Sequence, residues 1–305
     1  MPIAVIAAVL ICAMALTKKT CIICGHPSAL VVFYSKYCPV CLVIMSKGLH
    51  KNVRKSALIA AWNKEADAFL CYYTGVKLNV RDTASPFYLT FDHAIPGDNT
   101  RFVVCARFVN EMKSQMSETE FRTNILLLAK HFRTGEPIDQ SLFKLEYFRP
   151  KPKARARAPA LPGMGLPLTG YFPQNCEICG KKPMKRGFYC VRCHGIMTIE
   201  SYDIDAKVQA LKAAYDKEVD GFRCHYTGFL LDLKDPASPW LLNFDHSFPG
   251  QPGKFWLACQ IINQMKTQLS EEEFRKVVME LAEHFETKEP YDRDIIKFEY
   301  WNRPR

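Results

Sequence analysis

Phe91-Asp92-His93 is the stretch around which this sequence is organised, and Phe244-Asp245-His246 repeats it 153 residues further along the chain. Each triplet follows an apolar run and precedes a Pro-Gly turn. Seventeen residues after each histidine an asparagine, Asn110 or Asn263, lies on a segment with helical spacing. A carboxylate and an amide oxygen suit a hard divalent cation, and an imidazole beside them can take a proton from water. The repeated pattern therefore predicts two metal-dependent sites.

The two triplets belong to an internal duplication that runs through most of the chain. From Cys71 and Cys224 onward the two copies align with a constant offset. The repeat is far too long for a solenoid, so it describes two domains of ordinary size. The predicted organisation is an apolar N-terminal segment, a first unit, a basic Pro-rich linker and a second unit, at residues 1–20, 21–149, 150–175 and 176–305.

Composition favours packed cores and is compatible with a polyanionic partner. Of the 305 residues, 48% are hydrophobic and 12% are aromatic, which supports packed cores rather than disorder. Lys and Arg outnumber Asp and Glu by 41 to 31, a net charge of +10. This excess of positive charge is compatible with a nucleic-acid partner but does not require one, because many basic proteins bind no nucleic acid.

Eight of the thirteen cysteines form four Cys-x-x-Cys pairs, two in each unit. Two such pairs a short distance apart match a four-thiolate zinc site, because each pair fits a tight turn and a tetrahedral ion closes the loop between them. The alternative is a disulfide framework in a secreted chain. The repetition favours two structural zinc sites and an intracellular, reducing compartment. The expected ligands are Cys21, Cys24, Cys38 and Cys41, and Cys176, Cys179, Cys190 and Cys193.

The N-terminal run Pro2–Leu16 is almost wholly apolar. It is about as long as the core of a signal peptide and too short to span a membrane comfortably, and it lacks a basic start. We expect a buried helix or one that faces a protein partner. An export or membrane role is the less favoured alternative.

Helical spacing and capping signals predict an α+β fold in each unit. Residues 54–69 and 203–219 carry helix formers with apolar spacing. Turns entering a strand pair are expected near residues 73–75 and 226–228. The last helix of each unit is expected to start with a capping box, formed by Ser117 with Glu120 and by Ser270 with Glu273.

The linker carries basic residues and no acidic residue from Pro150 through Asn175. Its proline content suits an extended chain, and its cations could lie along phosphates or in a minor groove. A solvated tether is the alternative. The expected nucleic-acid contacts in the linker are Lys151, Lys153, Arg155 and Arg157.

A resemblance adds to this pattern. The order Cys-x-Tyr-x-Gly, Phe-Asp-His with Pro-Gly after it, then Asn-x-x-Lys on a helix, is similar to the HNH (His-Me finger) endonucleases over residues 71–115 and 224–268. The resemblance implies two ββα-metal units, each with a zinc finger upstream. It implies that His93 and His246 act as general bases. It also implies that Asp92, Asn110, Asp245 and Asn263 hold Mg²⁺ or Mn²⁺.

The resemblance implies metal-dependent hydrolysis of DNA phosphodiesters, with double-stranded DNA as partner and no small-molecule cofactor. Lys113 and Lys266 follow the asparagines by one helical turn and are expected to meet phosphates. Many relatives have an asparagine in the loop after the histidine, where the nearest equivalents here are Arg101 and Lys254. The alternative is therefore a catalytically inactive nucleic-acid-binding protein or a structural component of a nucleoprotein assembly.

Overall fold

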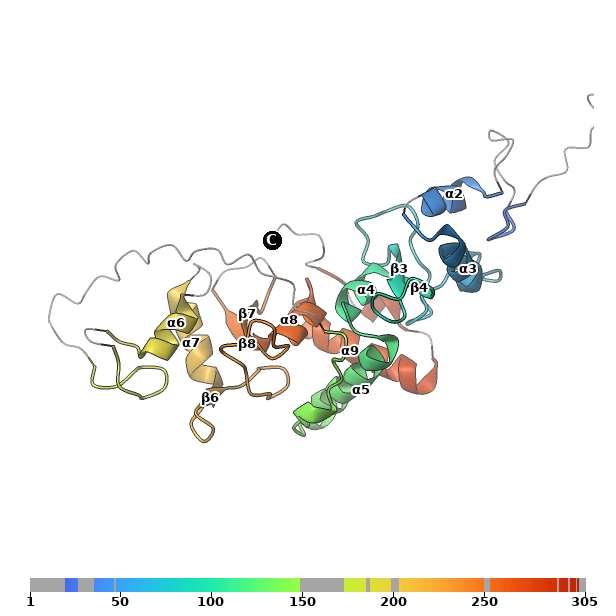
Figure 1. Ribbon diagram of the computed structural model, residues 1–305. Helices are drawn as coiled ribbons and strands as arrows, with labels where there is room; N and C mark the ends of the chain where they lie inside the picture. The colour runs from blue at the N-terminus through green and yellow to red at the C-terminus, as the bar shows by residue number, and fades with distance from the viewer. Residues whose placement is uncertain are drawn as a thin grey trace, which may run out of the picture.

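The computed structural model shows a mixed helix and small-sheet, α+β, protein (Figure 1). It describes residues 20–26, 36–46, 48–148, 173–184, 187–198, 203–249, 253–289, 291–295, 297–299 and 301. The predicted helix at Pro2–Leu16 lies outside the described residues. So do the predicted linker contacts of Lys151, Lys153, Arg155 and Arg157.

The elements follow the same order in both copies, and each pair of strands is antiparallel. The first copy contains α2 (Pro39–Ser46), α3 (Lys51–Ala61), β1 (Trp62–Asn63), β2 (Ala68–Phe69), β3 (Leu89–His93), β4 (Phe102–Ala106), α4 (Arg107–Lys113), α5 (Glu118–Thr134) and η1 (Gln140–Leu142). The second contains α6 (Val191–Met197), α7 (Ile204–Ala214), β5 (Tyr215–Asp216), β6 (Gly221–Phe222), β7 (Leu242–His246), β8 (Phe255–Cys259), α8 (Gln260–Lys266), α9 (Glu271–Thr287) and η2 (Arg293–Ile295).

The helices α3 and α7 end earlier than the predicted ranges 54–69 and 203–219. Beyond them the chain turns back in the short pairs β1–β2 and β5–β6. The connecting turns contain Asp67 with φ 49° and Asp220 with φ 47°, a left-handed conformation through which no right-handed helix continues. The helix-forming residues after position 61 and position 214 therefore belong to turns and strands.

The predicted capping boxes are present at the start of α5 and α9. Ser117 Oγ accepts the Glu120 N–H, and the Glu120 carboxylate accepts the Ser117 N–H. Glu120 also accepts the N–H of Glu146, so one carboxylate caps the helix and holds the tail that follows it. Glu273 accepts the N–H of Glu299 at 2.7 Å in the same way. Each tail therefore runs back along its own helix.

The two copies pack together around α5 and α9, which lie side by side at the centre of Figure 1, and α4 packs against α8. The contacts across this interface are reciprocal. The Arg122 guanidinium lies 4.4 Å from the centre of the Phe285 ring, and the Arg275 guanidinium lies 4.5 Å from that of Phe132. Each such contact joins a cation to an aromatic face of the other copy.

While it runs back along its own helix, each tail also packs an aromatic side chain into the opposite copy. Phe143, in the tail after α5, packs on Phe229 with ring centres 5.6 Å apart. Phe298, in the tail after α9, packs on Phe87 at 5.4 Å and on Phe108 at 5.0 Å. Phe143 and Phe298 are both buried, so each copy supplies part of the other's core.

Candidate metal centres and the Asp-His hairpins

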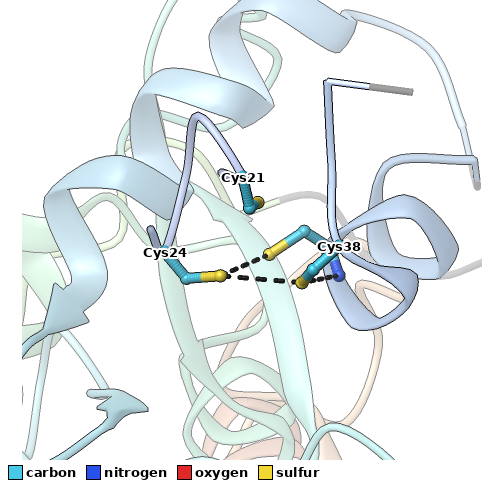
Figure 2. Close-up of side chains that lie close together, drawn as sticks. Cys21, Cys24 and Cys38 are labelled. Carbon is cyan, nitrogen blue, oxygen red and sulfur yellow. Dashed lines mark hydrogen bonds between the residues drawn. The ribbon is translucent and has the colours of Figure 1, made fainter. Parts of the chain in front are cut away.

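Two groups of four cysteines converge, one in each copy, with the sulfur atoms of each group within 4.8 Å of one another. Figure 2 shows three thiols of the first group pointing toward a common centre. The groups are those predicted, Cys21, Cys24, Cys38 and Cys41 in the first copy and Cys176, Cys179, Cys190 and Cys193 in the second.

Local backbone geometry brings each set of thiols together. In the first copy the N–H of Gly25 donates to the Cys21 carbonyl at 2.9 Å, closing a tight turn around the first pair. Gly25 has φ 75°, which explains a glycine at this position. The second pair starts at Cys38, directly before α2, where the Cys41 N–H faces its sulfur at 3.5 Å.

The distances within the clusters fit zinc. Cys24 Sγ lies 3.6 Å from Cys38 Sγ and 3.7 Å from Cys41 Sγ, and Cys179 Sγ lies 3.6 Å from Cys190 Sγ. A tetrahedral ion with Zn–S bonds of about 2.3 Å separates its sulfurs by about 3.8 Å. A disulfide would require about 2 Å, and every cysteine in the described residues has a free thiol. The two clusters are therefore zinc-finger-like sites.

Hydrogen bonding in the clusters favours the metal-binding form of one thiol in each. Burial raises the pKa of Cys21, but backbone hydrogen bonds from Cys24, Cys38 and Ile23 outweigh burial and bring the pKa to about 7. Cys176 reaches a pKa of about 7 for the same reasons. Because zinc binds thiolates, these thiols release their protons readily on metal binding.

Zinc content tests the two clusters directly. The full chain is expected to hold about two zinc ions per molecule, and Cys24→Ser is expected to leave about one, because a hydroxyl is a poor fourth ligand for zinc. Metal analysis of the purified protein measures this ratio. Cys12→Ser is the matched control and should leave the zinc content unchanged. Two zinc ions in Cys24→Ser would contradict the assignment of the first cluster.

The strands β3 and β4 and the helix α4 bring the predicted Asp-His-Asn residues into one hairpin-helix substructure. His93 ends β3 and pairs with Phe102 at the start of β4. Asn110, on α4, donates from Nδ2 to the Phe91 carbonyl at 3.3 Å. In the second copy β7, β8 and α8 repeat this arrangement, and half-buried Asn263 lies on α8.

Both carboxylate oxygens of Asp92 are engaged inside the protein. Tyr73 donates its hydroxyl proton to Oδ2 at 2.6 Å, and the Lys113 ammonium donates to Oδ1 at 3.1 Å. Lys113 also donates to the His93 carbonyl at 2.9 Å. Asp92 is 4% exposed and Lys113 is 1% exposed, so the network is nearly dry. It is a buried ion pair completed by neutral hydrogen bonds.

The second copy has the same network. Tyr226 donates to Asp245 Oδ2 at 2.5 Å, and Lys266 donates to Asp245 Oδ1 at 3.1 Å and to the His246 carbonyl at 3.0 Å. Asp245 is 5% exposed and Lys266 is 1% exposed. Although the sequences of the two copies have diverged, both bury these three side chains together.

The ionisation of this network follows from its burial. Burial raises the pKa of Asp92, while the Lys113 ammonium and the Tyr73 hydrogen bond act in the opposite direction. Burial and the neighbouring carboxylate raise the pKa of Tyr73, so its hydroxyl keeps the proton that it donates. An uncompensated charge here would be costly, and Lys113 supplies the compensation.

The structure gives Lys113 and Lys266 surroundings different from those expected of phosphate-binding residues. Their ammonium groups point inward to Asp92 and Asp245 and are nearly inaccessible to solvent. A residue one helical turn after a site residue can face the core as well as a ligand.

His93 and Asp92 project to opposite faces of the hairpin, as consecutive strand residues do. The His93 ring lies against its cross-strand partner Phe102, with ring centres 4.5 Å apart. Its Nε2 lies 3.2 Å from Asn99 Oδ1, in the loop between the strands. Asn99, which has no counterpart in the second copy, therefore contacts the histidine of the first. His246 lies 4.7 Å from the Phe255 ring.

Among the described residues, the two cysteine clusters are the groups of three or more His, Cys, Asp or Glu side chains placed to hold a metal ion. The Asp-His hairpins do not form such a group. Tyr73 and Tyr226 were not predicted as part of this network. The sequence did offer an indication, because a tyrosine recurs at the same position of the Cys-x-Tyr-x-Gly motif in both copies. The buried hydrogen bonds of these tyrosines to the aspartates explain why the residue is the same in both.

No described helix is long and apolar enough to cross a membrane. Comparison of the chain with protein-family models, with characterised proteins and with solved structures finds no match.

Proposed function

We propose that the protein is a zinc-stabilised nucleic-acid-binding scaffold whose two hairpin-helix units do not cleave their ligand. The observation that carries this proposal is the pairing of each aspartate with a buried lysine, Asp92 with Lys113 and Asp245 with Lys266. Each ammonium already neutralises the carboxylate that a catalytic cation would need.

A divalent cation competes poorly with these lysines on physical grounds. To reach Asp92, the ion would have to displace the Lys113 ammonium and leave it buried without a counter-charge, at a cost of several kcal/mol. Mg²⁺ also keeps several of its waters when bound, and this nearly solvent-free network offers them little space. The same argument applies to Asp245.

The net charge of +10 supports nucleic acid as the partner. Phosphates attract basic proteins without any demand on base sequence. The basic, acid-free linker adds a second source of phosphate contacts. A scaffold of this kind suits a structural component of a nucleoprotein assembly, in which two similar units contact one polyanion.

Metal-dependent DNA cleavage is the second candidate. It is favoured by the order strand, strand, helix in each copy and by the position of His93 at the end of its strand, with Asn110 on the following helix. In this case Lys113 and Lys266 would have to withdraw when a cation and DNA bind. The HNH resemblance supports this candidate, and the buried lysines oppose it.

One experiment separates the two candidates. We expect the full chain to bind duplex DNA in a gel-shift assay and to leave supercoiled plasmid intact with Mg²⁺ or Mn²⁺. The double variant His93→Ala/His246→Ala should behave identically. Cleavage by the wild type that the double variant abolishes would overturn the scaffold proposal. Failure of both proteins to bind DNA or RNA would overturn the nucleic-acid assignment.

The salt dependence of binding measures the contribution of the linker. Replacing Lys151 and Lys153 with glutamine should reduce the slope of log binding constant against log salt by about 1.8, or about 0.9 per lost phosphate contact. The matched control replaces Lys130 and Lys276, which are already paired with Glu136 and Glu272. An equal effect in both variants would show that the linker is only a tether.

A further inference from the structure

The outward face of α2 (Pro39–Ser46) in the first zinc finger is apolar and exposed. Seven of the eight residues of α2 are apolar, yet only Cys41, Ile44 and Met45 are buried. Leu42 is 38% exposed and Val43 is 55% exposed. They share one face with Pro39 and Ser46, because helical neighbours recur three and four residues apart. A short helix that is apolar on both faces indicates a second contact partner.

The second finger shows that zinc binding does not require this face. In α6 (Val191–Met197) the residues Cys193, Ile196 and Met197 are buried, just as their counterparts are in α2. The positions that match Leu42 and Val43 are His194 and Gly195. On the matching face of α6 only Val191, the counterpart of Pro39, is an exposed apolar residue, so the same cluster geometry is built without the adjacent apolar pair.

The turn between the first two cysteines of each cluster also differs between the copies, with an exposed apolar residue in the first and a polar residue in the second. Ile22, between the first two zinc ligands, is 46% exposed, and Glu177 occupies the matching position of the second finger. Single exposed apolar residues are ordinary on protein surfaces. Three on one small finger, each replaced by a polar residue or glycine in its sister finger, indicate a surface that something covers.

The chain itself supplies an occupant. The apolar run Pro2–Leu16 precedes the first finger and is joined to Cys21 by only four residues, 17–20. Four residues span up to about 13 Å, so the run is tethered close to α2. Such a tether corresponds to a local concentration in the millimolar range. As a helix the run would be about 22 Å long, short of the roughly 30 Å apolar layer of a membrane.

We propose that residues 2–16 pack on the outward face of α2 and bury Leu42 and Val43 within the same molecule. The two apolar surfaces then cover each other, and the first finger becomes the anchor of the N-terminal segment. This inference is independent of nucleic-acid binding.

Amide hydrogen exchange of the full-length protein, followed by mass spectrometry, tests the proposal. We expect slowed exchange over residues 3–16 and an increase of at least about tenfold in Val43→Glu, because a charge at the contact opposes burial. Gly195→Glu is the matched control in the second finger. A side chain at Gly195 meets no neighbouring atom within 4 Å, and this substitution should leave exchange unchanged. Zinc content in both variants reports that the fingers remain folded.

Three results would overturn the proposal. The first is unprotected exchange of residues 3–16 in the wild type, and the second is exchange that Val43→Glu does not alter. The third is protection that depends on another molecule. Light scattering would then show a dimer that dissociates on dilution, or the protein would float with phosphatidylcholine vesicles and show protection only in their presence.

Discussion

Replacing Lys113 with methionine is expected to lower the free energy of unfolding by about 3–5 kcal/mol. Methionine fills much of the same space but leaves the buried Asp92 carboxylate without the ammonium that lies 3.1 Å from it. The remaining donor, the Tyr73 hydroxyl, is neutral and compensates only part of the charge. Urea denaturation followed by tryptophan fluorescence measures the change. Lys266→Met should reproduce it in the second copy, where the ion pair is the same.

The loss of unfolding free energy caused by Lys113→Met is expected to become smaller as the pH falls. Burial raises the pKa of Asp92, and the substitution removes the ammonium that opposes this rise. A carboxyl group whose pKa is higher in the folded than in the unfolded state stabilises the fold below its unfolded pKa, and this contribution is lost as the pH rises through the folded pKa. The difference in unfolding free energy between wild type and variant should therefore be smaller at about pH 5 than at about pH 8.

Two further variants make this prediction specific. Lys130→Met removes an exposed lysine from its contact with Glu136 and should change the stability far less, because solvent screens exposed ion pairs. Asp92→Leu combined with Lys113→Met removes both charges and should recover part of the stability. A loss in Lys113→Met no larger than that in Lys130→Met would contradict the assignment of a buried ion pair.

The parts of the fold that the sequence predicted correctly depend on local patterns. The Cys-x-x-Cys pairs specify turns and helix starts, and their spacing predicted both clusters. Ser117 and Glu120 specify a helix start through their own side chains, and the capping box is present. The helix ends after Ala61 and Ala214 were missed, because the turns at Asp67 and Asp220 depend on backbone conformations that propensity does not report.

The candidate site was less predictable, because burial decides what its residues do. An aspartate, a histidine and a lysine with this spacing suit a metal and a phosphate as well as they suit an internal ion pair. Packing of α4 on the hairpin places the Lys113 amine inside, and no local pattern distinguishes this from exposure to solvent. The crossing of the two tails was also not predicted, since it joins residues more than 80 positions apart in the sequence, such as Phe143 and Phe229.

Cutting the linker is expected to leave the two copies associated. The tails after α5 and α9 are each buried in the opposite copy, and α5 packs along α9, so non-covalent contacts hold the halves together. A protease site inserted between residues 160 and 165 allows the cut to be made in the folded protein. Size-exclusion chromatography without denaturant should then recover both fragments in a single peak.

Phe298→Ala in the cut protein is expected to weaken this association strongly. Phe298 is 7% exposed and packs on Phe87 and Phe108 of the other copy, so truncation removes a large apolar contact and leaves a cavity. Such truncations cost about 3–5 kcal/mol, which corresponds to a rise of roughly 100- to 5,000-fold in the dissociation constant of the halves. Phe248→Ala, at a side chain that is 45% exposed, is the control and should leave the complex intact. If the cut wild-type halves separate on the column, the crossed tails do not hold the copies together. If they stay together and Phe298→Ala changes nothing, the Phe298 contact is not needed for the association.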